Sequence, residues 1–311
     1  MKRLRIGCVM SDIFFPMDDT QYVGHAWKSF HEAVMVLGHQ VVTIGLRVYD
    51  EIGLRSEGEV PDDLDACAFI APHPDCPQLR RIVRAGVPSV LVGSKLPIAG
   101  TDCVDVDNRK VGQLAGDLFL KAGHERVAFV TTSPTQVSSM ERHAGLQQAY
   151  RAAGKPASSV KYYSLNEPTT LEDTDALAED LVEAYSQIES FGWHGNPGVM
   201  EAFLAQLKQD GVTALLSFND QDARMIVDRL IRSGRGVPSE VSVVGVDNVG
   251  RFVLGNPRLS SIGQNVPQIC RVAVRLLMAR IEDPHAPSQV VLVQPSLHDR
   301  GSVVPPVRAA A

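Results

Sequence analysis

The sequence lacks any long apolar run. No segment approaches the roughly 20 apolar residues that a helix needs to cross a bilayer. The first apolar run, Ile6 to Met10, is also far shorter than the apolar core of a secretory signal. These absences predict a protein of the cytoplasm with no membrane partner.

Concentrated basic charge is missing as well. The formal net charge is -6, and Lys and Arg are scattered among Asp and Glu. Binding of nucleic-acid phosphates normally requires a basic face. The only basic cluster, Lys2, Arg3 and Arg5, lies at the N-terminus, where a solvated chain end is the simpler interpretation.

The cysteines show no pattern of pairing. None of the five is part of a C-x-x-C pair, and none has metal-ligand spacing to histidine. We therefore expect reduced thiols, no metal site and no cofactor. Cys8 and Cys103 lie in apolar runs typical of strands, so packing in a core is their expected role.

Catalytic motifs are absent too. The chain has no G-x-S-x-G elbow, no G-x-G-x-x-G turn after a strand and no phosphate-binding P-loop. The nine histidines do not pair with a plausible nucleophile. The sequence therefore favours a binding protein over an enzyme.

Short apolar runs rich in Val and Ile alternate with amphipathic stretches along most of the 311 residues. This alternation is typical of β-α-β units around a parallel sheet, and the length suits two α/β lobes or one large domain. We predict strands at 6–10, 40–44, 66–70, 88–92, 126–130, 160–163, 212–217, 241–246 and 259–262. Helices are predicted at 22–37, 78–85, 111–122, 141–152, 200–209 and from about 220 to 231.

Capping residues mark several helix ends. Gly38 and Gly123 follow predicted helices, where a left-handed residue commonly ends a helix. Asp107 and Asn108 precede a helix and are interpreted as cap and hinge residues. Asp220 is predicted to be the N-cap of the helix that follows it.

The segment from Asp107 to Val130, DNRKVGQLAGDLFLKAGHERVAFV, resembles the lactose-repressor/galactose-repressor (LacI/GalR) family of transcription regulators. The sensor domain of that family shares the fold of periplasmic sugar-binding proteins. Further segments match in family order: RHAGL at 142–146, LSFNDQDAR at 216–224, SEVSVVGVDN at 239–248, and the segments 259–264 and 295–303. The resemblance extends from Arg5 to Val303.

This resemblance implies two doubly wound parallel-sheet lobes of the periplasmic-binding-protein-like type I fold, joined by three crossovers. One lobe would combine residues 1–106 with 266–293, and the other would combine 107–262 with 296–311. A ligand cleft would lie at the carboxyl ends of both sheets. No helix-turn-helix domain is expected in this chain, because the first strand starts only a few residues after Met1.

The family pattern also implies a function. The chain would bind a small, sugar-like effector, form a homodimer and control DNA binding by lobe closure, with the DNA-binding head lying outside this chain. Two other classes remain open at this point. One is a free-standing solute-binding protein that serves a transporter, and the other is an enzyme on the same fold.

Four polar residues form the expected effector site. A sugar presents hydroxyls that donate and accept, so its site needs carboxylates, amides and a guanidinium. By resemblance, Arg142, Asn219 and Asp247 occupy effector-contacting positions, and Gln264 borders the same site at a crossover. Asn219 and Asp247 have the alternative of capping adjacent turns. Arg142, expected to open a helix after the loop 131–139, has the alternative of a surface charge.

Aromatic side chains complete the expected site. Trp193 follows an acidic segment, 165–192, that we interpret as an insertion carrying a surface helix. By resemblance its ring stacks on the ligand, with ordinary packing as the alternative. Ser11, Phe14 and Phe15 follow the first strand, where either phenylalanine covers the ligand or belongs to the core.

One departure from the family concerns the ligand. After the predicted strand 88–92, where several sugar-sensing relatives carry an acid, this chain has Gly93-Ser94-Lys95. A sugar would lose one hydroxyl partner there. The sequence therefore leaves the class of ligand open.

Overall fold

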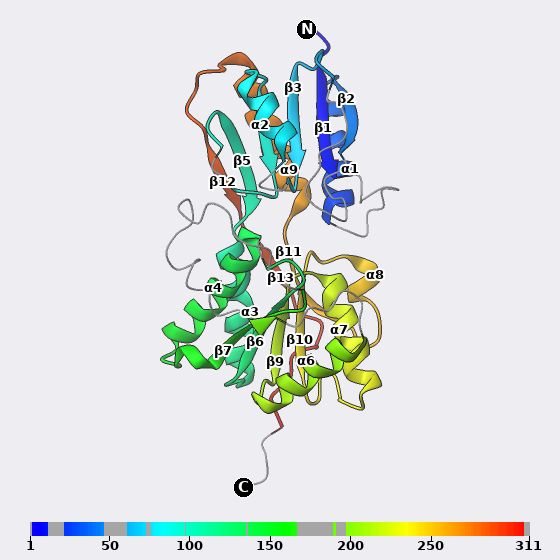
Figure 1. Cartoon of the computed structure of the whole chain (residues 1–311), viewed down its shortest axis with the longest axis vertical. Coiled ribbons are helices and arrows are strands. Elements are labelled where there is room, and N and C mark those ends of the chain that lie inside the picture. The colour runs from blue at the N-terminus through cyan, green and yellow to red at the C-terminus, as the bar shows by residue number, and fades with distance from the viewer. Residues whose placement is uncertain are drawn as a thin grey trace. The chain divides into compact units, whose positions relative to one another are not determined.

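The computed structural model describes residues 2–11, 22–46, 61–72, 76–96, 98–134, 136–166, 189–190 and 197–307 (Figure 1). The chain divides into two compact units. Unit 1 comprises Met1–Val106 and Asn265–Gln294, and unit 2 comprises Asp107–Gln264 and Pro295–Ala311. The chain therefore passes from one unit to the other three times.

Two absences hold for the residues that the structure describes. None of their helices combines the length and apolarity needed to cross a membrane. No group of three or more His, Cys, Asp or Glu side chains among them is arranged to hold a metal ion.

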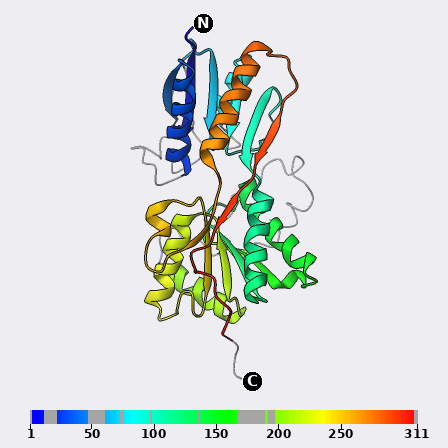
Figure 2. The ribbon, with the colours of Figure 1, turned by 180° about the vertical axis from the view of Figure 1, so that it is seen from behind.

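Unit 1 is built on a six-stranded sheet whose strand pairs are all parallel. Its strands are β1 (Arg5–Ser11), β2 (Gln40–Leu46), β3 (Ala66–Ile70), β4 (Ser89–Val92), β5 (Thr101–Val106) and β12 (Val290–Val293). They lie in the order β12-β5-β4-β3-β1-β2. Helix α2 (Pro77–Arg84) covers one face, and α1 (Tyr22–Val36) and α9 (Val266–Glu282) lie together on the other (Figure 2).

The two faces of this sheet follow from the alternation of side chains along each strand. Phe69 and Leu91 pack with Leu79 and Ile82 of α2 in one apolar cluster. On the other face, the Cys270 thiol of α9 contacts the α1 backbone. All five cysteines are buried and unpaired, so the prediction that Cys8 and Cys103 pack in a core is confirmed.

A buried ion pair joins α9 to β5 in unit 1. Nε and Nη2 of Arg280 donate to the two carboxylate oxygens of Asp102 at 3.1 and 2.8 Å, and both side chains are almost fully buried. Between α9 and β12, Nη1 donates to the carbonyl oxygens of Pro284 and Ala286, and Nη2 also donates to that of Pro287. The N–H of Gln289 donates to Asp102 at 2.8 Å. The pair therefore fixes the segment that leads into β12.

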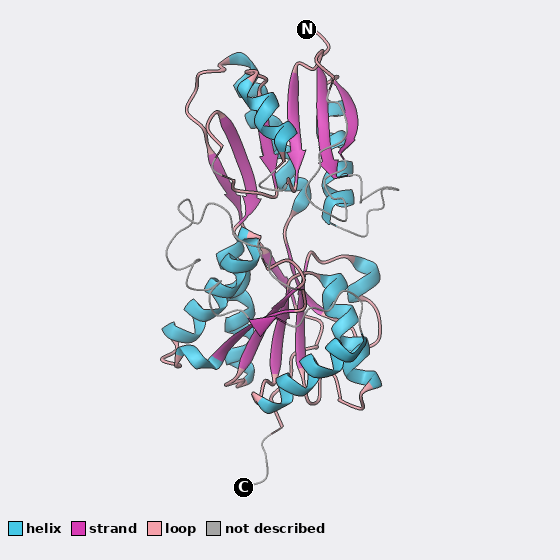
Figure 3. Cartoon of the chain, in the orientation of Figure 1, coloured by secondary structure: helices cyan, strands magenta, loops and turns pink. Residues whose placement is uncertain are grey.

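Unit 2 carries a seven-stranded sheet with helices on both faces (Figure 3). Its strands are β6 (Val127–Thr131), β7 (Val160–Ser164), β8 (Glu189–Ser190), β9 (Ala214–Ser217), β10 (Ser242–Val246), β11 (Ser260–Gly263) and β13 (Ser296–His298). Their order is β13-β11-β10-β9-β6-β7-β8, and only β13 runs antiparallel to its neighbour. The described helices are α3 (Asn108–Ala122), α4 (Val137–Ala152), η2 (Ala157–Ser159), α6 (Pro197–Gln209), α7 (Asp220–Arg232) and α8 (Gly250–Val253).

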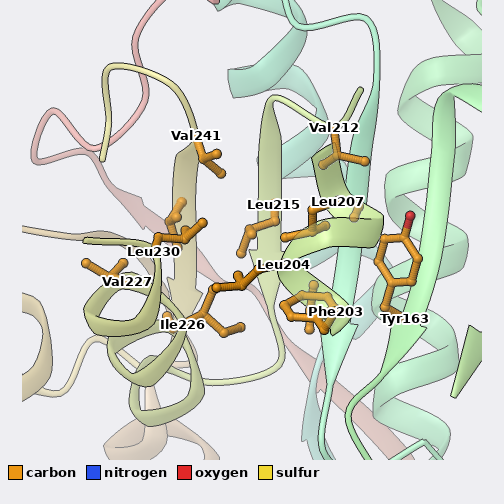
Figure 4. Close-up of a cluster of buried hydrophobic side chains, with 14 of the residues drawn as sticks. Tyr163, Phe203, Leu204, Leu207, Val212, Leu215, Ile226, Val227, Leu230 and Val241 are labelled. Atoms are coloured by element: carbon orange, nitrogen blue, oxygen red, sulfur yellow. The ribbon is translucent and has the colours of Figure 1, made fainter. Parts of the chain in front are cut away.

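Successive residues of β6 serve opposite faces of this sheet. Val130 packs in the core beneath α6 and α7, where Phe203, Leu215 and Leu230 meet (Figure 4). Phe129 instead lies within ring contact of Tyr162 and of His143 from α4. Unit 2 is therefore a layered α/β/α body.

Helices α3 and α4 touch through their backbones. A Cβ added to Gly112 would lie 2.0 Å from the carbonyl oxygen of Arg142, and one added to Gly145 would lie 2.0 Å from that of Arg109. Only glycine permits this approach. The contact fixes where the first turns of α4 lie relative to α3.

The predicted fold class is confirmed, because both units are α/β lobes on mostly parallel sheets. Gly123 ends α3 in a left-handed conformation, and Asp107 caps its start by accepting from the Lys110 N–H, as expected. Two local predictions were wrong. Helix α4 begins at Val137, so Arg142 lies in its second turn, and the N-cap of α7 is Asn219 rather than Asp220.

His143 gives unit 2 a specific sensitivity to acid. Its imidazole is fully buried beside Tyr162 at 4.5 Å, and in the described part of the chain neither ring nitrogen has a hydrogen-bond partner. Burial, assisted by the charge of Arg151, lowers the pKa of His143 from 6.5 to about 3. The unfolded state therefore binds the proton first, and stability is lost as the pH falls below 6.5.

We expect wild type to lose roughly 1 kcal/mol more unfolding free energy than His143→Phe between pH 7 and pH 5.5. Denaturant unfolding at the two pH values measures the difference. His285 is exposed, and His285→Phe should keep the wild-type pH dependence of the unfolding free energy. Equal slopes for wild type and His143→Phe would contradict a neutral His143.

Candidate functional site

Four neighbouring strands of unit 2 end in polar residues at one edge of the sheet. Gln264, Asp247, Phe218-Asn219 and Thr132 directly follow β11, β10, β9 and β6. These strands are parallel, so their carboxyl ends share an edge, where open α/β sheets bind ligands. Helices α4 and α7 add Arg142 and Asp222. The candidate site is this set of residues.

Arg142 is 3% exposed, so the alternative of a surface charge is wrong. Its Nε donates to Oδ1 of Asn108 at 2.9 Å, and Nη1 donates to the carbonyl oxygen of Phe218. The guanidinium also lies over the Phe218 ring, 4.8 Å from its centre. These contacts compensate a buried cation and hold it in one orientation.

Asp247 and Asn248 turn the chain sharply after β10, with φ values of 107 and 62. The Asp247 carboxylate accepts a hydrogen bond from Nε2 of Gln264. Within the described residues it accepts from no backbone N–H, so it does not cap the turn. Burial raises the pKa of Asp247, the nearby Arg142 and Gln264 oppose the rise, and the charge of Asp222 adds to it.

Asn219 uses its side-chain oxygen as a helix cap. Oδ1 accepts from the N–H of Asp222 at 2.7 Å, which confirms the capping alternative for that oxygen. The amide nitrogen makes no hydrogen bond to any described residue. Contact between Asn219 and an effector through this nitrogen therefore stays a prediction.

Asp220 has a structural role different from the predicted cap. Its carboxylate accepts from the Ser261 hydroxyl at 2.6 Å and from the Val249 N–H at 2.8 Å, which joins α7 to β11 and to the turn that follows β10. A Cβ at Gly245 would lie 2.2 Å from this carboxylate. Burial and the neighbouring Asp247 raise the pKa of Asp220.

The structure adds Asp222 and Thr132, which sequence reasoning missed. The Thr132 hydroxyl donates to Oδ2 of Asp222 at 2.7 Å. Burial raises the pKa of Asp222 to about 6, although the Thr132 bond opposes the rise. The sequence NDQD gave only a weak signal for Asp222: this acid lies two residues after Asp220, on the first turn of α7.

Other predicted site residues lie outside the described part of the chain. These are Phe14, Phe15 and Trp193, together with the side chain of Ser11, whose backbone ends β1. Gly93 has a φ of 71, and an added Cβ would meet the Tyr22 ring. A local steric requirement thus accounts for glycine at this departure from the family.

Related proteins are known from their sequences. The HTH-type transcriptional repressor PurR of Aliivibrio fischeri (strain MJ11) is 28% identical over 204 residues, which are 66% of this chain and 53% of the repressor. The HTH-type transcriptional regulator GalR of Salmonella typhimurium (strain SL1344) is 27% identical over 247 residues, 77% of this chain and 64% of that regulator. The chain therefore spans less than two thirds of either relative.

Solved structures share the fold. The transcriptional regulator CelR–cellobiose complex superimposes with a TM-score of 0.71 at 21% identity, covering 97% of this chain and 85% of that one. A LacI family transcriptional regulator from Enterococcus faecium with bound ribose gives a TM-score of 0.70 at 17% identity, covering 97% and 99%.

Two family models match overlapping segments of the sequence. A model described as periplasmic binding protein-like domain matches residues 117–303, and one described as periplasmic binding proteins and sugar binding domain of LacI family matches 16–186. The first includes Arg142, Asn219, Asp247 and Gln264. The chain thus belongs to the family of periplasmic binding proteins and LacI-family sugar-binding domains.

Proposed function

We propose that this chain is the effector-binding part of a LacI-type transcription regulator that works in the cytoplasm and has no catalytic activity. The observation that carries the proposal is the arrangement of Arg142, Asp247 and Gln264 at the carboxyl edge of one parallel sheet. Family membership and the transcription regulators among the relatives support it.

The effector is a small polar molecule that resembles a sugar. Arg142 donates to its oxygens, and Asp247 accepts from its hydroxyls, with Gln264 and the amide of Asn219 beside them. Ser11, Phe14, Phe15 and Trp193 complete the contacts, the aromatic rings covering apolar faces of the ligand. Relatives of the same fold were solved with cellobiose and with ribose.

Effector binding controls DNA binding by biasing an equilibrium between open and closed arrangements of the lobes, residues 1–106 with 266–293 and 107–262 with 296–311. A difference of a few kcal/mol between the two states is enough to switch the population. The chain acts as a homodimer and meets DNA through a head outside this sequence. Sedimentation at micromolar concentration tests the dimer.

The two alternative functions have less support. A solute-binding protein for a transporter and an enzyme on the same fold would both use the same edge of the sheet. However, the relatives reported above are transcription regulators. Turnover of a bound metabolite by the purified protein would favour the enzyme.

Thermal-shift measurements with pentoses, hexoses, sugar phosphates and purines test effector binding. We expect at least one compound to raise the unfolding midpoint of wild type, because a ligand bound only to the folded state stabilises it. Asp247→Ala should abolish the rise, since losing a charged hydrogen bond costs about 1.5–3 kcal/mol, roughly 10- to 150-fold in affinity.

Asp117→Ala is the matched control. Asp117 is an exposed acid on α3, so its removal changes the net charge equally and should leave the ligand-induced rise intact. An undiminished rise in Asp247→Ala would remove Asp247 from the site. No rise with any compound in wild type would count against effector binding itself.

A further inference from the structure

Asp222 is an acidic residue of the candidate site to which the sequence resemblance gives no role. Its backbone N–H donates to Oδ1 of Asn219, and its Oδ2 accepts from the Thr132 hydroxyl, both at 2.7 Å. Asn219 follows β9 and Thr132 follows β6, and these strands are neighbours. The Asp222 carboxylate is therefore fixed at the carboxyl edge of the sheet.

This carboxylate is half-buried without a cation beside it. Among the residues that the structure describes, no Lys, Arg or His forms an ion pair with Asp222. Burial raises the pKa of Asp222 to about 6, and the Thr132 hydroxyl offsets only part of that effect. A partly dehydrated carboxylate is costly unless additional donors reach it.

The charge of Asp222 also acts on Asp247. The charge of Asp222 raises the pKa of Asp247, whereas the charge of Arg142 lowers it. Burial and the charge of Asp247 raise the pKa of Asp220, whereas the charge of Arg300 lowers it. Nε and Nη1 of Arg142 already donate to Asn108 and to Phe218. The Asp222 and Asp247 carboxylates thus share one nearby guanidinium, that of Arg142.

Resting on the proposed function, we propose that Asp222 determines specificity by selecting ligands with several hydroxyl or amine donors and no anionic group. Such a ligand satisfies the Asp222 and Asp247 carboxylates together. A phosphate or carboxylate on the ligand would instead add a like charge in a partly dehydrated site, where repulsion is stronger than in water. Asp222 therefore makes the site discriminate between a sugar and the corresponding sugar phosphate or sugar acid.

Equilibrium dialysis with mass-spectrometric detection tests this selection. The probes are a defined library of uncharged sugars, amino sugars, purine bases, sugar phosphates and sugar acids. Wild type should retain only uncharged or amine-bearing members. Asp222→Asn keeps the size of the side chain and removes its charge, and should improve the affinity for sugar phosphates or acids relative to the parent sugar at least tenfold.

Asp228→Asn provides the matched control. Asp228 is an exposed acid on the same helix, so the variant removes an equal charge away from the candidate site and should retain wild-type selectivity. If the role of Asp222 were purely structural, Asp222→Asn would lower the affinity for all ligands alike and leave the ratio of the affinities unchanged.

The outcomes separate this inference from the proposed function. If wild type retains a sugar phosphate or acid as tightly as the parent sugar, effector binding stands and the role of Asp222 is overturned. An unchanged ratio in Asp222→Asn overturns that role in the same way. If no library member is retained by any of the three proteins, the proposed function fails and the role of Asp222 fails with it.

Discussion

Asp102→Ala is expected to lower the unfolding free energy of unit 1 by about 3–5 kcal/mol, because it leaves the Arg280 guanidinium buried without its counter-charge. The N–H of Gln289 loses its acceptor in the same variant. Trp27 of unit 1 provides the measurement. In a Trp193→Phe background it is the only tryptophan, and its fluorescence follows denaturant unfolding.

Asp63→Ala is the matched control for this prediction. Asp63 pairs with Arg5 in the same unit, but its side chain is 64% exposed. Exposed pairs contribute little, so the expected loss is below about 1 kcal/mol. Similar losses for Asp63→Ala and Asp102→Ala would show that burial does not make the Arg280 pair important.

Gly145→Val is expected to destabilise unit 2 by about 3 kcal/mol or more and to abolish effector binding. The first side-chain carbon alone would lie 2.0 Å from the carbonyl oxygen of Arg109. A backbone oxygen cannot move as a flexible side chain does, so α4 must separate from α3. That separation breaks the bond from Arg142 to Asn108. Faster amide exchange in α3 and α4 would reveal the loss.

Gly250→Val tests whether glycine replacement as such is harmful. A Cβ at Gly250 meets no atom within 4 Å, and the position lies at the start of the short helix α8. The expected cost is below about 1 kcal/mol, the range of ordinary helix propensities. Unchanged exchange in Gly145→Val would contradict the close packing of α3 on α4.

Most of the fold could be predicted because its signals are local. Apolar strands and amphipathic helices appear as short periodic segments, and Gly123 and Asp107 have helix-capping roles that need no partner elsewhere in the chain. Strand β12 was missed for the opposite reason. Its residues are mostly exposed or half-buried, and its place in the sheet depends on pairing with β5, far away in sequence.

The candidate site could likewise be predicted only in part. Family motifs identified Arg142, Asp247 and Gln264, which the structure brings to one sheet edge. The motifs gave no sign of the pair between Thr132 and Asp222, whose members lie on different elements and meet only in the folded unit. The sequence could not decide between Asn219 and Asp220 as the N-cap of α7, because both residue types cap helices well.

The bonds of Arg142 and Asp247 have a consequence for energetic coupling. Arg142 donates to Asn108, the second residue of unit 2, and Asp247 accepts from Gln264, the last residue before the chain returns to unit 1. A bound molecule that displaces either group acts directly on a connecting segment. Thermodynamic linkage is reciprocal, so if a bound molecule shifts the equilibrium of those connecting segments, restraining the segments with a cross-link must change the affinity for that molecule.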